Sequence, residues 1–291
     1  MDLTLSLLIN AIVAGILLGG FYAAVSIGIS ISFGMLDIVN IAHPAFIILG
    51  SFVAYTVNLH LGIDPILVNF ILSPAFFLLG IAMYRWYYVA FERRGRESLS
   101  GLAFFFGILF IGEVALLLIF GADYRTVHAP YIGPTLEWGA INLPLRLFVP
   151  FLVSVGVVIA VQLYLTRTFT GRGILAVSQN PVALQLMGAN PQRIKAVAFG
   201  LSIATAAVAG AFLIIIQPVE PSIGREYIGR VFAVCVLGGM GSIPGTLLAA
   251  IILGVAESFT ATFYGPSWAP AVSFGLLLLT LAVRPAGLLG R

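Results

Sequence analysis

Two glutamates interrupt long apolar stretches of the sequence. Glu113 lies within GILFIGEVALLLIF, and Glu257 lies within IILGVAESF. A charged side chain at the centre of a membrane helix costs about 2.5–3.5 kcal/mol, so such residues normally face other helices and have partners there. Two interpretations follow. Each glutamate is either a structural group that is hydrogen-bonded between helices, or an ion or proton site on a transport pathway.

Two serines in the first apolar stretch could also take part in transport. Ser26 and Ser30 are four residues apart, so they share one face of a helix and could line a polar seam. The alternative is that each hydroxyl donates to a carbonyl of its own helix, as serines in helices commonly do.

Two segments, near residues 34–45 and 231–243, place glycine or proline just before a long apolar stretch. FGMLDIVNIAHPAF contains Asn40 and His43, and LGGMGSIPG contains the closely spaced Gly238, Gly239 and Gly241. Interrupted helices in corresponding halves are typical of a transport pathway, where the N–H groups of a half-helix can face an anionic group. The glycines could equally serve close helix packing. The candidate pathway residues are Ser26, Ser30, Asn40, His43, Glu113, Gly238, Gly239, Gly241 and Glu257.

Patterns for catalysis, nucleotide binding or metal binding do not occur. The only lysine, Lys195, follows no glycine-rich loop, which excludes a P-loop for ATP in this chain. His43, His60 and His128 are scattered, so no metal site is expected, and no nucleophile stands next to a base. The single cysteine, Cys235, excludes an internal disulfide. We therefore expect no enzyme activity, no cofactor in this chain and no nucleic-acid partner.

The stretch SQNPVALQLMGANPQ predicts a short helix between two apolar runs. Asn180 is a good N-cap, Pro181 suits the first turn, and Gly188 suits the C-terminal cap. So short a helix is unstable alone in water and must pack against something. Its apolar Leu184 and Met187 could lie on lipid headgroups or under the bundle, or could dock into a groove of a soluble partner.

The composition requires a membrane environment. Hydrophobic residues make up 60% of the 291 residues and charged residues 9%, against about 25% charged residues in soluble domains. The long apolar runs predict an all-α integral membrane protein with about eight transmembrane helices. They cover residues 5–33, 45–60, 66–91, 101–121, 144–166, 194–218, 243–263 and 267–283.

No stretch between these runs is long enough for a soluble domain, so residues 1–291 are expected to form a single transmembrane domain that includes the loop 168–192. The first run could be one tilted helix or a helix followed by a half-helix. The run 231–240 is too short to span a membrane.

The distribution of basic residues predicts the orientation. Because lysine and arginine concentrate in cytoplasmic loops, we expect residues 92–99, 168–192 and the C-terminus on the cytoplasmic side and residues 122–143 outside. The basic residues that support this are Arg93, Arg94, Arg96, Arg167, Arg172, Arg193, Lys195, Arg284 and Arg291.

Five segments, in order, resemble one family of membrane proteins. They are GGFYAAVSIGISISFGMLDIVNIAHPAFIILGSF, FGILFIGEVALLLIFG, TGRGILAVSQNPVALQLMGANPQRIKAVAFGLS, VLGGMGSIPGTLLAAIILGVAES and RPAGLLGR. Together they resemble the branched-chain amino acid permeases of ATP-binding cassette importers, LivH type, over nearly the whole chain. One departure is Pro44, which stands where the family usually has glycine after Ala-His and which removes a backbone N–H.

The resemblance implies an assembly and a role for the short helix. It implies a homologous second permease subunit, two cytoplasmic ATPase subunits and a periplasmic substrate-binding protein. It also implies a multi-pass protein of the bacterial inner membrane, in contact with the lipid bilayer. By this resemblance, the helix after Asn180 is similar to the family's coupling helix, which contacts an ATPase subunit. The candidate coupling residues are Asn180, Pro181, Leu184, Met187 and Gly188.

The resulting hypothesis is a permease subunit that moves branched-chain amino acids or related small amphipathic solutes by alternating access. Urea, short amides and aromatic acids also remain open as substrates, because specificity in such importers rests mostly with the binding protein. The alternative is a self-sufficient secondary transporter or channel that uses Glu113 and Glu257 as ion or proton sites. Such a protein would have no need of the helix after Asn180.

Overall fold

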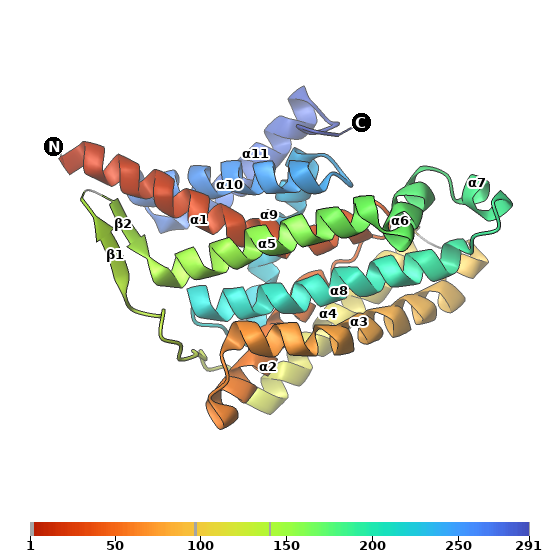
Figure 1. The fold of residues 1–291 in the computed structure, drawn as a ribbon, viewed down its shortest axis with the longest axis horizontal. Helices are drawn as coiled ribbons and strands as arrows, with labels where there is room; N and C mark the ends of the chain where they lie inside the picture. The colour runs from red at the N-terminus through yellow and green to blue at the C-terminus, as the bar shows by residue number, and fades with distance from the viewer. Residues whose placement is uncertain (1–2, 96–97, 140, 291) are drawn as a thin grey trace.

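The chain forms a bundle of long helices with one small hairpin (Figure 1). The computed structural model describes residues 3–95, 98–139 and 141–290. The α-helices are α1 (Leu3–Ser32), α2 (His43–Leu61), α3 (Pro65–Ala90), α4 (Ser98–Phe120), α5 (Leu145–Arg167), α6 (Phe169–Gln179), α7 (Pro181–Leu186), α8 (Pro191–Ile216), α9 (Gly224–Gly238), α10 (Ile243–Phe263) and α11 (Ala269–Val283). The remaining elements are the 3-10 turns η1 (Glu92–Arg94), η2 (Pro221–Ile223) and η3 (Pro266–Trp268) and the strands β1 (Thr135–Trp138) and β2 (Ile141–Pro144).

Eight helices among the described residues are long and apolar enough to cross a membrane. They coincide with the eight apolar runs of the sequence, so the prediction of an all-α integral membrane protein with about eight spans is confirmed. The first run is a single helix of 30 residues. The hairpin, in which Thr135 pairs with Pro144 and Trp138 with Ile141, was not predicted.

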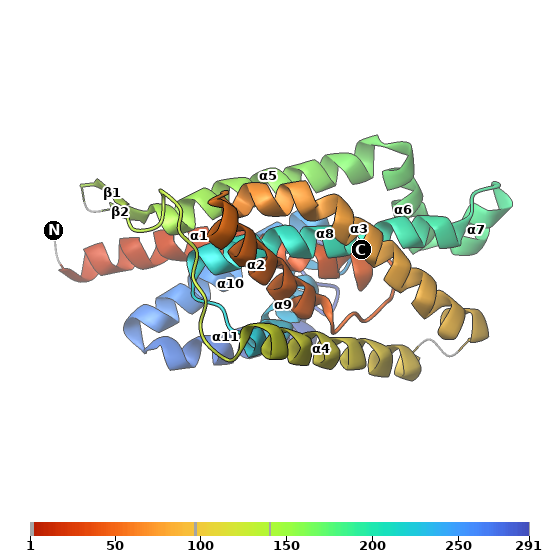
Figure 2. The same cartoon turned by 90° about the horizontal axis from the view of Figure 1, so that it is seen from below.

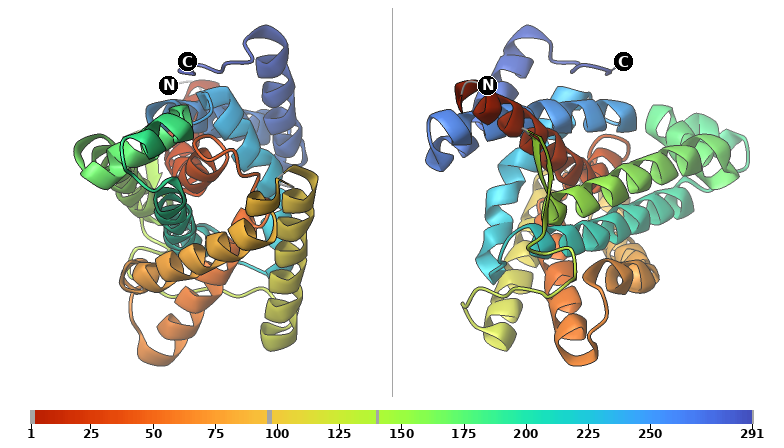
Figure 3. Two further views of the ribbon diagram at one scale, coloured as in Figure 1. Left: turned by 90° about the vertical axis from the view of Figure 1, so that its right-hand side faces the viewer. Right: turned by 60° about the vertical axis from the view of Figure 1, so that its left-hand side comes forward.

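Helices α1 and α8 occupy the centre of the bundle. In the apolar windows of these two helices, 72% and 89% of residues are buried, against 17% in α4 and 11% in α11. The left view of Figure 3 shows the bundle from the end that carries α7, and Figure 2 shows α4 and α5 on opposite sides. Glycine allows a close contact between α1 and α10, where a Cβ on Gly15 would lie 2.5 Å from the Cα atom of Val255.

The two ends of the bundle carry different structures. The N-terminus and the hairpin lie at one end, where the Asn142 amide donates to the Asn10 Oδ1 atom at 2.8 Å. The loop before the hairpin is fastened to the same end, because Arg125 and Val219 form an isolated β-bridge. Helices α6 and α7 lie at the opposite end (Figure 1).

The predicted loops 92–99 and 168–192 share an end of the bundle. The Lys195 Nζ atom, in the first turn of α8, lies 2.6 Å from the Glu92 Oε1 atom in η1. The C-terminal segment contacts the end of α9, where the Leu288 amide donates to the Leu237 carbonyl. The loop after α9 in turn contacts the residues after α1, because the Gly241 amide lies close to Gly34. These loops therefore lie at the end of the bundle opposite residues 122–143, as the distribution of basic residues predicts. Arg96 and Arg291 lie outside the described residues.

Both interrupted segments of the sequence are breaks between helices. The chain leaves α1 at Ser32, passes through residue Asp37 at a φ of 57°, and enters α2 only at His43. Helix α9 has 15 residues, starts seven residues before the predicted run 231–240, and ends at Gly238. Pro44 and Pro244 both stand in the first turn of a helix, where the missing N–H has no helical partner to lose.

Candidate functional site

Helix α7 is closed by a cap at each end. The Asn180 Oδ1 atom accepts from the Ala183 amide at 2.9 Å, and Pro181 follows as the first helical residue. After the C-cap Met187, Gly188 has a φ of 83°, and its amide donates to the Gln185 carbonyl. Glycine suits this left-handed position because it has no Cβ. The short helix therefore has the limits that the sequence predicts.

The apolar residues of α7 divide between the inside and the outside. Leu184 is only 6% exposed and belongs to the same buried cluster as Ile174 and Val177 of α6. By contrast, Leu186 is 85% exposed and Met187 76% exposed. The Leu184 side chain is therefore covered by its own chain and anchors α7; its predicted role in coupling stays a prediction. The free apolar tip of α7 consists of Val182, Leu186 and Met187.

Helix α6 supports α7 and was missed in the sequence, where only one short helix was expected in this loop. The Thr168 side chain caps α6 by accepting from the Gly171 amide at 3.0 Å. Gly171 lets α6 turn sharply against α5, because a Cβ there would lie 2.1 Å from the Tyr164 carbonyl oxygen. The Thr168 cap and the apolar spacing of Gly171, Ile174 and Val177 were the available signals.

A cleft of about 580 Å³ separates α7 from the end of α3. Val182 and Gln185 line one side, and Tyr88 and Glu92 line the other. Near the cleft the Glu92 carboxylate accepts from Lys195 at 2.6 Å and from the Tyr84 hydroxyl at 2.9 Å. Because this ion pair joins η1 to the first turn of α8, it ties the two basic loops together at one end of the bundle.

The polar residues of the first broken segment are buried. The His43 Nε2 atom lies 3.1 Å from the Val25 carbonyl oxygen, while its Nδ1 atom has no partner among the described residues. Asn40 and Ser26 are also fully buried, and the described residues offer no partner to either side chain. Ser30 differs, because its Oγ atom accepts from the Thr246 hydroxyl at 3.1 Å. These candidate pathway residues thus lie in the packed core; whether they contact a substrate stays a prediction.

The three candidate glycines lie where chain segments touch. A Cβ on Gly238 would lie 2.6 Å from the Gly245 carbonyl carbon. Gly239 and Gly241 have φ angles of 93° and 80°, which side chains rarely adopt. At Gly239 a Cβ would lie 2.3 Å from the Gly290 amide nitrogen, so the C-terminal segment closes over the end of α9. This geometry favours the packing interpretation of the glycines.

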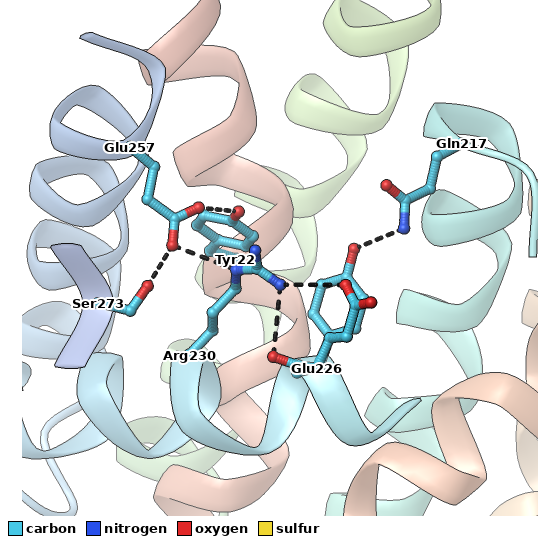
Figure 4. A network of polar contacts seen from close by, with 7 residues as sticks. Tyr22, Gln217, Glu226, Arg230, Glu257 and Ser273 are labelled. Atoms are coloured by element: carbon cyan, nitrogen blue, oxygen red, sulfur yellow. Dashed lines mark hydrogen bonds and ion pairs between the residues drawn. The ribbon is translucent and has the colours of Figure 1, made fainter. Parts of the chain in front are cut away.

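Glu257 is the centre of a polar cluster inside the bundle (Figure 4). Its Oε2 atom accepts from the Tyr22 hydroxyl of α1 at 2.5 Å. Its Oε1 atom accepts from Arg230 of α9 at 3.2 Å and from the Ser273 hydroxyl of α11. Four helices therefore meet at one carboxylate, and its charge is balanced by the Arg230 guanidinium.

Glu113 is paired elsewhere, between α4 and the start of α9. Its carboxylate accepts two hydrogen bonds from Arg225, at 2.5 Å from Nη2 and 2.8 Å from Nε. Arg225 stands in the first turn of α9, and its guanidinium also lies 5.9 Å from the centre of the Phe110 ring. The two glutamates thus belong to separate clusters, and each has an arginine of α9 as its partner.

The arginines of α9 were missed in the sequence because α9 was not identified as a helix before residue 231. The spacing of Glu226 and Arg230 was the available signal, because residues four apart lie on one face of a helix. A carboxylate within a membrane helix is costly without a partner, and Arg225 and Arg230 stand between the predicted runs 194–218 and 243–263. Each could therefore have been expected to seek one of the two membrane carboxylates.

A family model described as "Branched-chain amino acid transport system / permease component" matches residues 11–281. The chain belongs to this family. It is accordingly a multi-pass membrane permease, and a transport component rather than an enzyme. The alternative of a self-sufficient transporter is not favoured.

Similar proteins extend over almost the entire chain. The high-affinity branched-chain amino acid transport system permease protein BraD of Pseudomonas aeruginosa is 29% identical over 97% of this chain and 96% of its own length. The permease protein LivH of Escherichia coli K12 is 28% identical over 95% of this chain and 94% of its own length.

A second permease protein from E. coli K12 matches only in part. LivM is 36% identical over 43% of this chain and 29% of its own length. The chain is thus similar to two permease proteins of one bacterium. A solved structure, PsaBC from Streptococcus pneumoniae in complex with Fab, aligns over 95% of this chain and 91% of that chain with 13% identity and a TM-score of 0.49.

Proposed function

We propose that this chain is one of two permease subunits of an ATP-driven importer for branched-chain amino acids in the bacterial inner membrane. The family and the full-length similarity to LivH and BraD support the transport of such amino acids. The partial similarity to LivM supports a homologous second permease. Two ATPase subunits and a periplasmic binding protein complete the proposed assembly.

The observation that carries the proposal is the exposed apolar tip of α7. Leu186 and Met187 are held at fixed positions by the caps of α7 and by the buried Leu184, yet their own side chains contact little of this chain. An amphipathic helix with exposed apolar residues is a common way to fill a groove on a partner. In the proposed assembly that groove belongs to an ATPase subunit, which also binds the nucleotide; this chain needs no cofactor of its own.

The same contacts indicate how movement of α7 would reach the bundle. Leu184 packs with α6, α6 packs on α5 and α8, and the Lys195–Glu92 ion pair fastens α8 to the end of α3. A displacement of the α6–α7 loop would therefore be transmitted to the central helix α8. Alternating access then follows if ATP-driven closure of the ATPase pair moves these loops in both permeases together.

The experiment changes the exposed tip and leaves the anchor in place. Leu186→Asp and Met187→Asp are expressed with the complete importer, and Leu186→Met is the matched control because it keeps the apolar surface. Burial of one such side chain contributes about 1.5–3 kcal/mol, so attachment of the ATPase should weaken about tenfold or more. Co-purification of the ATPase and uptake into vesicles are measured.

Three outcomes decide the proposal. We expect loss of ATPase recovery and of uptake in the two aspartate variants, with both retained in the methionine control. Leu184→Asp should instead lower the yield of folded permease, because it buries a carboxylate without a partner. Normal ATPase recovery and normal uptake in both aspartate variants would show that α7 lies on lipid, and the coupling role would be rejected.

A further inference from the structure

A pocket of about 340 Å³ lies between α1, α5, α8, α9, α10 and α11. Its rim includes Leu147 at the start of α5, Gln217 at the end of α8 and Pro266 of η3, all at the end of the bundle that carries the N-terminus. Tyr22 and Arg230, which are largely buried, line it as well. The pocket therefore reaches toward the end opposite α7, the outer end in the proposed orientation.

The lining of this pocket combines charge with apolar walls. Glu226, Arg230 and Glu257 line it together with the aliphatic Leu18, Leu147 and Ile216. Two carboxylates and one guanidinium give the lining a formal charge of −1, from +1 and −2. The volume is within the range of about 300–1,000 Å³ that small-molecule sites occupy.

The two carboxylates differ in how many partners they have (Figure 4). Glu257 is nearly fully buried and already accepts from Tyr22, Arg230 and Ser273. The Glu226 side chain is 67% exposed, and its carboxylate only approaches Arg230, at 3.9 Å. Glu226 therefore retains oxygen atoms that can accept hydrogen bonds from a ligand.

Arg230 likewise keeps a free donor group. Its Nε atom donates to Glu257 and its Nη1 atom to the Glu226 carbonyl oxygen. Its Nη2 atom donates to none of the described residues. An open carboxylate, a free guanidinium amine and aliphatic walls thus occur in one pocket.

We propose that this pocket binds an aliphatic amino acid as a zwitterion during transport. The Glu226 carboxylate accepts from the ligand ammonium group, and the Arg230 Nη2 atom donates to the ligand carboxylate. The aliphatic walls cover the hydrocarbon side chain, and Glu257 and Tyr22 fix the position of Arg230. This site rests on the proposed function, because it takes the imported amino acid as its ligand.

The test uses the complete membrane importer in lipid nanodiscs, without the binding protein. Binding of radiolabelled leucine is measured directly for wild type and for Glu226→Gln. Glu220→Gln is the matched control, since Glu220 lies near the same end of the bundle but does not line the pocket. We expect saturable binding in wild type and in the control, and at least tenfold weaker binding in Glu226→Gln.

Two analogues identify the groups that are recognised. Isoamylamine lacks the carboxylate of leucine, and 4-methylpentanoate lacks the ammonium group, so neither should compete as well as leucine. Equal competition by the amine would show that only a cation is bound, which would overturn the zwitterion site. Absence of leucine binding at millimolar concentration, or unchanged binding in Glu226→Gln, would also overturn it.

Recovery of the ATPase separates this proposal from the proposed function. We expect Glu226→Gln to retain its ATPase subunits, because the pocket is at the end of the bundle opposite α7. Normal ATPase recovery and normal uptake without any leucine binding would reject the pocket and leave the importer role intact. Loss of ATPase recovery in wild type would reject the importer role itself.

Discussion

The two glutamates of the apolar helices form ion pairs of opposite character. Glu257 and Arg230 are enclosed by helices, with side-chain exposures of 3% and 14%. In the other pair, here called the outer pair, the Glu113 side chain is 13% exposed, but its partner Arg225 at the start of α9 is 57% exposed. The residue types and the helix that supplies the arginine are the same in both pairs.

The difference shows that the position of a glutamate within an apolar run does not determine how exposed its ion pair is in the folded protein. The inner pair joins α9 to α10 and, through Tyr22 and Ser273, to α1 and α11. It therefore contributes to the fold directly. The outer pair connects only α4 to the start of α9 and leaves the guanidinium half uncovered. In the proposed importer we expect water or another protein around this guanidinium, because exposed arginine is costly in lipid.

The largest effect is expected from removal of the inner arginine. Arg230→Met leaves the Glu257 carboxylate buried without its counter-charge, which costs about 3–5 kcal/mol when one partner of a buried pair is removed. The unfolding midpoint of the purified permease in detergent, followed by circular dichroism, should fall strongly. The double variant Arg230→Met with Glu257→Gln should recover part of the loss. An unchanged midpoint in the single variant would show that the pair does not hold the helices.

An intermediate effect is expected at the Lys195–Glu92 pair, whose side chains are 19% and 14% exposed. Lys195→Met removes a hydrogen bond to a charged group, which contributes about 1.5–3 kcal/mol. The Glu92 carboxylate keeps the Tyr84 hydroxyl as a donor, so the loss should be smaller than at Arg230. The same unfolding measurement ranks the two variants. A larger shift for Lys195→Met than for Arg230→Met would contradict the comparison.

The eight membrane spans could be predicted from the sequence because the length of an apolar run is enough to identify a membrane helix. The eight spans and the caps at Asn180 and Gly188 depend on local residue types, and all were identified. Burial of Leu184 beside exposed Leu186 depends on α6, whose packing arises from a close approach at Gly171. The partners of the glutamates depend on the path of α9, which is set by contacts far apart in the chain.

The outer pair should give the smallest change, and the same substitution in both pairs tests this directly. Glu113→Gln keeps an acceptor for Arg225 and places no new charge in the core, so the unfolding midpoint should stay within measurement error of wild type. Glu257→Gln leaves Arg230 enclosed with less counter-charge and should lower the midpoint clearly. We also expect Glu113→Gln to retain assembly with the second permease and transport, because a glutamine amide can hold the start of α9 as the carboxylate does. Normal assembly with loss of uptake in Glu113→Gln would mean that the charge itself acts on the transport pathway, and the outer pair would then carry the function that the inner pocket is proposed to serve.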